Sequence, residues 1–185
     1  SDAQARAVLG CIDRQTPIGC RDYAMCLLLY TYGVRGGQVR ELRIEDLDWA
    51  GDRIRFRALK HGKETVLPLT KDVGLSLYQY LQQRPSHSYR RIFLSSRAPF
   101  VPLLRSSNLS TRVATYLDRA GIEHGPRGAH GFRHGFATRK LAEGHTLKSI
   151  ADVLGHRHLD TTFIYTKVDF AQLEQAALPW PGGGR

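Results

Sequence analysis

The chain has 185 residues, enough for one domain with a buried core, and its 42% apolar and 24% charged residues are ordinary for a globular protein. No apolar run approaches the roughly 20 residues of a membrane span and no signal peptide is evident, so we expect a cytoplasmic protein that does not enter a membrane. The charge balance of 27 Lys and Arg against 17 Asp and Glu gives +10. This excess favours a polyanion such as nucleic acid or an anionic membrane surface; a solvated basic surface is the alternative.

The N-terminal part of the chain has the apolar pattern of helices. Residues 2–14 predict a first helix that ends near Pro17, and the strongly apolar residues 21–32 predict a second helix with Gly33 as its stop. Residues 36–42 predict a short third helix. Three cysteines without Cys-x-x-Cys spacing occur here, and we interpret them as reduced packing residues of a cytosolic protein. They are Cys11, Cys20 and Cys26.

The pattern changes after residue 48. Residues 53–57 alternate polar and apolar side chains, a turn follows at residues 61–63, and residues 65–69 return as a second strand. These two segments predict a small antiparallel hairpin.

Apolar residues at helical spacing dominate the rest of the chain. The expected helices are one capped by Thr70 with an apolar stripe over residues 73–81, then residues 106–120, 130–143, a helix capped by Thr146 that reaches Leu154, one capped by Asp160 that carries Tyr165, and residues 171–177. Residues 179–185, which contain Pro and a Gly run, predict a flexible tail. The expected fold class is mainly α with a small antiparallel β-hairpin or sheet, an α+β fold.

A His-x-x-Arg motif stands out in the C-terminal third. His130 and Arg133 at i and i+3 share one helical face, where Arg can grip two phosphate oxygens and His can donate to a third oxygen or move a proton. A surface His and Arg without a common task would look the same. A zinc helix is a further alternative, because His130 and His134 stand at i and i+4. No Glu follows His130, however, and the histidines at positions 156 and 158 are not obvious partners.

Three more residues could serve the same chemistry. Tyr165, nine residues after His156, is a possible phenol nucleophile, although a Tyr on a helix is more often a core residue whose hydroxyl reaches solvent. Arg35 follows a buried helix, as a surface residue or as a ligand aimed inward. Lys60 lies at the hairpin tip, where it can contact phosphate or give a proton to a leaving oxygen, and spacing does not separate it from Lys63.

Taken in order, these residues resemble the tyrosine recombinase (phage integrase) family, from about residue 20 to residue 170. The motifs that carry the resemblance are Gly-Val-Arg35, the hairpin Lys60, His130-x-x-Arg133, Leu-Gly-His156 and Tyr165, supported by residues 39–43, 46–49, 66–69, 130–138 and 161–165. The resemblance implies a catalytic-domain fold of that family, double-stranded DNA as the partner, association with the nucleoid, and cleavage without metal, ATP or another cofactor.

The resemblance also implies a role for each residue. Tyr165 attacks the scissile phosphate, forms a 3′-phosphotyrosine and frees a 5′-hydroxyl. Arg35 and Arg133 neutralise the charge that develops on phosphorus. The remaining implied roles are general acid for Lys60, proton transfer for His130, and a hydrogen bond to a phosphate oxygen for His156.

Two departures from the family pattern are expected to matter. The family usually has an acidic residue three positions after the first Arg, where this chain has Gln38, which can hydrogen-bond but offers no charge. The family also usually carries an N-terminal DNA-clamping domain, and no segment here is long enough to be one. We therefore expect residues 1–178 to be a catalytic domain, cut from a longer recombinase and without its core-binding domain.

The C-terminal segment and the overall function leave alternatives. Residues 170–178 resemble the segment that docks on a neighbouring protomer in a four-protomer assembly on DNA, but folding back onto the chain's own core fits equally. Without DNA we expect a monomer. A non-catalytic DNA-binding module, with residues 146–168 as a helix-turn-helix, and a type IB topoisomerase are the two alternative functions.

Overall fold

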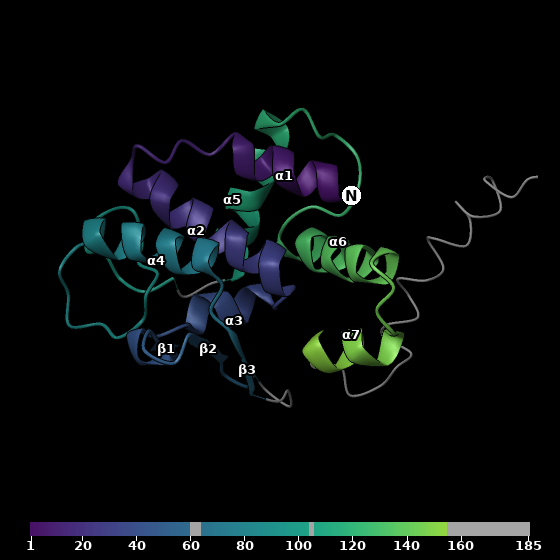
Figure 1. The fold of residues 1–185 in the computed structure, drawn as a ribbon. Coiled ribbons are helices and arrows are strands. Elements are labelled where there is room, and N and C mark those ends of the chain that lie inside the picture. The colour runs from purple at the N-terminus through teal and green to yellow at the C-terminus, as the bar shows by residue number, and fades with distance from the viewer. Residues whose placement is uncertain (60–63, 104–105, 155–185) are drawn as a thin grey trace, which may run out of the picture.

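The computed structural model describes residues 1–59, 64–103 and 106–154 (Figure 1). Its elements in chain order are α1 (Asp2–Gly10), α2 (Pro17–Tyr32), α3 (Gly36–Glu41), the 3-10 turn η1 (Ile44–Asp46), β1 (Leu47–Asp48), β2 (Arg53–Phe56), β3 (Thr65–Pro68), α4 (Lys71–Gln83), α5 (Ser106–Arg119), α6 (Ala129–Ala142) and α7 (Leu147–Leu154). The described part is thus mainly α with a small antiparallel sheet, as the sequence predicts. None of its helices is long and apolar enough to cross a membrane.

Helix α2 is the centre of the structure. It contacts α1, α3, α4, α5 and α6, and Figure 1 shows it crossing the middle of the fold. The helix begins at Pro17, whose missing N–H costs nothing at a first helical position, and the Thr16 hydroxyl accepts a hydrogen bond from the Gly19 N–H at 3.1 Å. The prediction that Pro17 marks the end of the first helix was therefore wrong. Helix α1 ends at Gly10, and α2 begins four residues before the expected position 21.

The C-terminal end of α2 is fixed by Gly33. Its backbone has φ 60° and ψ 17°, the left-handed conformation that glycine adopts without strain. A Cβ at this position would lie 2.6 Å from the ring of Phe136 on α6 and 2.9 Å from a methyl carbon of Leu154 on α7. The glycine therefore lets α6 and α7 approach the end of α2 closely.

The sheet has three strands in the order β1-β2-β3, all antiparallel, rather than the two strands of the expected hairpin. The additional strand, β1, has only two residues, which is too short to show an alternating pattern. On β2, Ile54 and Phe56 are fully buried, whereas Arg53 is exposed and Arg55 half-buried on the opposite face. The sheet thus covers the core with one face and presents arginines on the other.

The end of β3 is tied to the end of α2. The Tyr32 hydroxyl donates to the Pro68 carbonyl at 2.7 Å and accepts from the Thr70 N–H at 3.2 Å. Thr70 occupies the N-cap position of α4, but its side chain makes no capping hydrogen bond, so the expected cap acts only through its backbone. Thr146 does cap α7, because its hydroxyl accepts from the Ser149 N–H at 3.2 Å.

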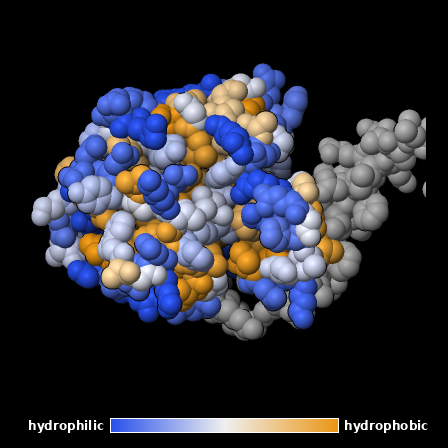
Figure 2. All heavy atoms as spheres, viewed as in Figure 1, coloured by the Kyte–Doolittle hydropathy of each residue, from blue (hydrophilic) through white to orange (hydrophobic). Residues whose placement is uncertain are grey.

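The core consists of one large cluster and a small one. The large cluster lies between α1–α5, the sheet and Phe132 of α6, and it includes the buried Cys20 and Cys26, whose thiols are free, as the packing interpretation expects. The small cluster joins α6 to α7 through Phe136, Ala137, Ile150 and Leu154. On the face shown in Figure 2, hydrophilic residues cover most of the described surface and apolar residues form separate patches.

Candidate active site

Arg133 lies where three helices meet. Its side chain is 2% exposed, its Nη1 donates to the Gly33 carbonyl at 2.9 Å, and its Nη2 donates to the Leu154 carbonyl at 2.7 Å. Gly33 is the C-cap of α2 and Leu154 the last residue of α7. Carbonyl groups at helix C-termini carry partial negative charge, so two helix ends hold this guanidinium in place.

Arg35 follows this junction directly. It stands two residues after Gly33, at the N-cap position of α3, with an exposed side chain. The hydrogen bond from Arg133 to Gly33 therefore brings the segment that carries Arg35 to a residue 100 positions away from Gly33 in sequence. The structure thus brings together the two segments whose arginines the sequence singles out.

His130 lies in the first turn of α6, one turn before Arg133, and its side chain is exposed. Gly131 explains how this turn fits: a Cβ there would stand 2.4 Å from the Pro126 carbonyl oxygen, so the helix start packs directly on the preceding loop. The neighbouring His134 is half-buried. Within the described residues, no group of three or more His, Cys, Asp or Glu side chains could hold a metal ion.

Gln38 is 8% exposed and connects α3 to the sheet. Its Oε1 accepts from the Arg35 N–H at 3.1 Å, and its Nε2 lies 3.5 Å from the Arg57 carbonyl oxygen. Arg57 comes directly after β2, three residues before Lys60. The residue that departs from the family pattern thus contacts both the backbone of Arg35 and the base of the segment that carries Lys60.

Three of the expected site residues, Lys60, His156 and Tyr165, lie outside the described residues, as do the expected helices after position 154 and the C-terminal segment. The carbonyls of Gly33 and Leu154 were not predicted as acceptors for Arg133. Gly33 was recognised only as a helix stop, and a backbone acceptor has no side-chain signature.

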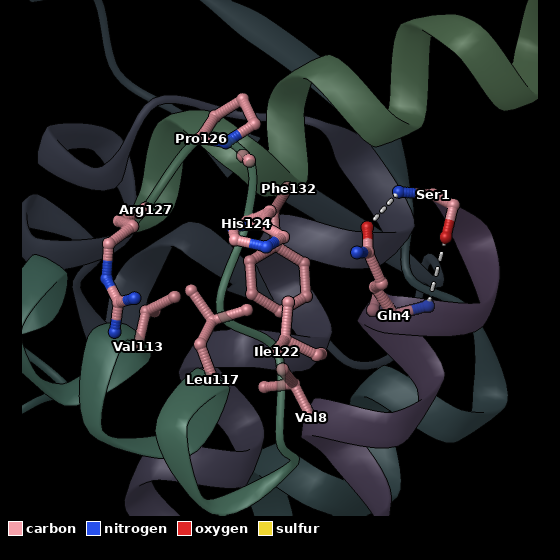
Figure 3. A pocket seen from close by; sticks show the side chains of 14 residues that line it. Ser1, Gln4, Val8, Val113, Leu117, Ile122, His124, Pro126, Arg127 and Phe132 are labelled. Carbon is pink, nitrogen blue, oxygen red and sulfur yellow. Dashed lines mark hydrogen bonds between the residues drawn. The ribbon is translucent and has the colours of Figure 1, made fainter.

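A small pocket lies beside the N-terminal turn of α6, and Figure 3 shows it from close by. It has room for about 60 Å³ between α1, α5, α6 and the loop before α6, which accommodates a few water molecules. Most of the side chains around it are apolar: Val8, Val113, Leu117, Ile122 and Phe132. Arg133 and Arg35 are not among its lining residues, so it is distinct from the helix junction.

Curated relatives match almost the whole chain. The putative integrase/recombinase y4gC of Sinorhizobium fredii is 41% identical over 182 residues, which cover 97% of this chain and 93% of the relative. The putative integrase/recombinase y4rA of the same organism is 48% identical over 176 residues, 95% of this chain but 42% of the relative. Tyrosine recombinase XerA of Thermococcus kodakarensis is 35% identical over 165 residues, 86% of this chain and 55% of the relative. The chain thus spans about half the length of several relatives.

Solved structures agree in fold. The crystal structure of a XerA recombinase has a TM-score of 0.76 at 25% identity and covers 97% of this chain and 63% of that one. A XerH site-specific recombinase bound to a palindromic difH substrate, in a post-cleavage complex, has a TM-score of 0.79 at 24% identity over 96% of this chain and 52% of that one. The family model described as the phage integrase family matches residues 2–172. By this match and by its identity to y4gC over nearly its whole length, the chain belongs to the phage integrase family.

Proposed function

We propose that this chain is the catalytic domain of a tyrosine recombinase that breaks and rejoins double-stranded DNA through a covalent bond to Tyr165. The observation that carries the proposal is the position of Arg133. Its guanidinium is held by two helix-end carbonyls beside the segment that carries Arg35. Family membership and the net charge of +10 support DNA as the substrate.

The proposed reaction exchanges one phosphodiester bond for another. The Tyr165 phenol oxygen forms a bond to the scissile phosphorus, and the bond from phosphorus to the 5′ oxygen breaks. Arg35 and Arg133 stabilise the negative charge on the non-bridging oxygens, and removal of one such donor typically costs on the order of 10²–10³ in rate. The reverse exchange, with a 5′-hydroxyl as the nucleophile, reseals the strand.

Three further residues complete the proposed set. Lys60 gives a proton to the departing 5′ oxygen, His130 assists the transfer of the proton from the phenol, and His156 donates a hydrogen bond to a phosphate oxygen. Because the phosphotyrosine bond keeps the energy of the phosphodiester, resealing needs no ATP. The arginines supply the charge stabilisation for which other nucleases use metal ions.

Residues 1–178 are the catalytic unit and residues 179–185 a tail. Residues 170–178 dock on a neighbouring protomer when four copies assemble on DNA, and bound protein is found with the nucleoid. We expect DNA affinity to fall steeply with salt, because phosphate contacts release counterions.

The test is incubation with a nicked double-stranded suicide DNA substrate, in EDTA and without ATP, followed by denaturing gel electrophoresis. Wild-type protein is expected to form a denaturant-resistant DNA adduct, and Tyr165→Phe is expected to form none. Tyr78→Phe is the matched control, because Tyr78 is exposed on α4 and its hydroxyl contacts only Gln82 among the described hydrogen bonds.

An adduct that persists in Tyr165→Phe would refute the assignment of the nucleophile. Absence of any adduct with wild-type protein would favour the non-catalytic DNA-binding module. An adduct that needs added metal would contradict the metal-independent chemistry. Relaxation of supercoiled plasmids that lack a recombination site would favour the topoisomerase alternative.

A further inference from the structure

The amide of Gln38 has a fixed orientation. The Arg35 N–H can only donate, so the atom that faces it at 3.1 Å is the amide oxygen. The Arg57 carbonyl can only accept, so the atom that faces it at 3.5 Å is the amide nitrogen. The two backbone partners thus require one acceptor and one donor from the same buried side chain.

Both partners belong to segments of the proposed active site. Arg35 is one of the two proposed phosphate-stabilising arginines, and Arg57 lies three residues before the proposed general acid Lys60. We propose that Gln38 is a positioning residue that ties the backbone of Arg35 to the strand leading to Lys60, and that this tie requires an amide. The inference rests on the proposed function. It adds that the amide of Gln38 matches both of its backbone partners, whereas the acidic residue usual in the family would match only one of them.

A carboxylate would meet only half of this requirement. In the Gln38→Glu variant, one oxygen of the ionised side chain could accept from the Arg35 N–H, but the other would face the Arg57 carbonyl oxygen, and two acceptors at that distance repel each other. Because the site is 8% exposed, water offers little compensation. A protonated glutamic acid would restore the donor.

The groups around position 38 would act in opposite directions on the protonation of a glutamic acid introduced there. Arg35 and Arg57 are cations, which favour an ionised carboxylate at this position, whereas burial and the Arg57 carbonyl favour the neutral acid. The Arg57 guanidinium is itself held by Asp46 at 2.8 Å and lies 4.0 Å from Glu45.

Helices α2 and α5 also pack against α3, but their charged side chains have other partners. Arg21 binds Asp22, Arg112 lies 3.7 Å from Asp22, and Asp118 pairs with Arg127. Among the described residues, the groups that act on the protonation of a glutamic acid introduced at position 38 are therefore mainly Arg35 and Arg57.

The test compares cleavage rates of wild type, Gln38→Glu and Gln38→Met on the suicide substrate, with Gln79→Glu as a control that makes the same chemical change at an exposed position of α4. Both position-38 variants are expected to cleave about 10- to 100-fold more slowly at pH 7.5, because small displacements of reacting groups cost about that much. DNA affinity is expected to stay within about twofold, because Gln38 makes no phosphate contact in this proposal.

The pH profile separates positioning from a general loss of packing. As the pH falls from 8 to 5.5, the rate of Gln38→Glu relative to wild type is expected to rise, because the protonated acid donates to Arg57 again, whereas the relative rate of Gln38→Met stays flat. Thermal melts of each variant verify folding at both ends of the pH range.

Each other outcome counts against the proposal. A Gln38→Glu variant as fast as wild type at pH 7.5 would refute the need for an amide, and a fast Gln38→Met variant would refute the tie itself. A slow Gln38→Glu variant with a flat relative pH profile would refute the role of the donor. If wild-type protein forms no adduct at all, the proposed function fails and the role of Gln38 in cleavage fails with it, whereas an active wild type with unaffected position-38 variants refutes the role of Gln38 alone.

Discussion

The two ends of α2 hold a buried arginine in different ways. Near the N-terminal end, Arg21 is 4% exposed and donates twice to the fully buried carboxylate of Asp22, at 2.9 and 2.7 Å. At the C-terminal end, Arg133 donates to the carbonyls of Gly33 and Leu154. Arg21 also donates to the Leu94 carbonyl at 2.9 Å, so the difference lies in its carboxylate partner: a carboxylate carries a full negative charge, whereas a helix-end carbonyl carries only a partial one.

The surroundings of Asp22 complete a structural network. Its second oxygen accepts from the Tyr116 hydroxyl at 2.9 Å and lies 3.7 Å from Arg112 on α5. Burial and the negative charge of Asp22 raise the pKa of the Tyr116 phenol well above its ordinary value, so this tyrosine stays a hydrogen-bond donor. One end of α2 therefore stabilises the fold with a buried ion pair, and the other end positions the guanidinium that we propose stabilises charge on the scissile phosphate.

The largest expected effect comes from Arg133→Lys. Lysine keeps the charge, but its single ammonium cannot reproduce the planar fork that reaches both helix ends and a phosphate. We expect cleavage to fall by about 10²–10³-fold, measured as the initial rate of adduct formation. Arg127→Lys, in the exposed loop before α6, is the control and should cleave like wild type. A rate for Arg133→Lys within threefold of wild type would show that the carbonyl junction is not needed for chemistry.

Substitution of Asp22 tests the N-terminal end of α2. Asp22→Asn leaves the buried Arg21 without its counter-charge, so the free energy of unfolding should fall by about 3–5 kcal/mol in urea denaturation. At a temperature where the variant is still folded, its cleavage rate should remain within a few-fold of wild type. Asp118→Asn, whose exposed pair with Arg127 should contribute at most about 1 kcal/mol, is the control. If Asp22→Asn lost cleavage but not stability, the ion pair of Arg21 and Asp22 would not have the purely structural role that we assign to it.

The sequence predicted the helices well where their stop and start signals are local. Gly33, Gly121 and Gly144 all end helical segments with positive φ, and each was identifiable from the pattern alone. The error at Pro17 arose because proline both ends and begins helices, and only the Thr16 cap resolves which. Strand β1 was missed because pairing with β2, not its own two-residue pattern, makes it a strand.

The site was predicted in part. The motif spacing identified Arg35 and Arg133, and the structure brings their segments together, whereas the remaining proposed residues other than His130 lie outside the described chain. The way Arg133 is held was not predictable, because its acceptors are backbone carbonyls that any residue could supply. The same holds for Gln38, whose two partners are an N–H and a C=O of the main chain.

The smallest expected effect concerns Arg139 on α6, which combines both modes. It donates to the Asp2 carboxylate at 3.0 Å and to the Tyr30 carbonyl at 2.7 Å. Burial alone would raise the pKa of Asp2, but hydrogen bonds from Arg6, Tyr30 and Arg139 outweigh it and lower the pKa below its ordinary value. A lowered folded-state pKa means that Asp2 stabilises the protein above the unfolded pKa near 4, and that this contribution is lost as the pH falls through the folded value.

Asp2→Asn should therefore melt at a lower temperature than wild type at pH 7, and the difference should shrink as the pH approaches 3. The Tyr30 carbonyl still binds Arg139 in this variant, so the change should be smaller than that of Asp22→Asn. Thermal melts between pH 3 and 7 measure it, and a difference that does not depend on pH would contradict the assignment of the carboxylate.

Helix α6 carries a second glycine whose surroundings are the reverse of those at Gly131. A Cβ on Gly131 would collide with the Pro126 carbonyl oxygen, but no atom of the described residues lies within 4 Å of the corresponding position at Gly135. Glycine inside a helix costs roughly 0.5–1 kcal/mol relative to alanine. Engineering of a more heat-resistant domain can therefore start with a substitution at position 135. At position 131, random mutagenesis is expected to recover very few folded variants.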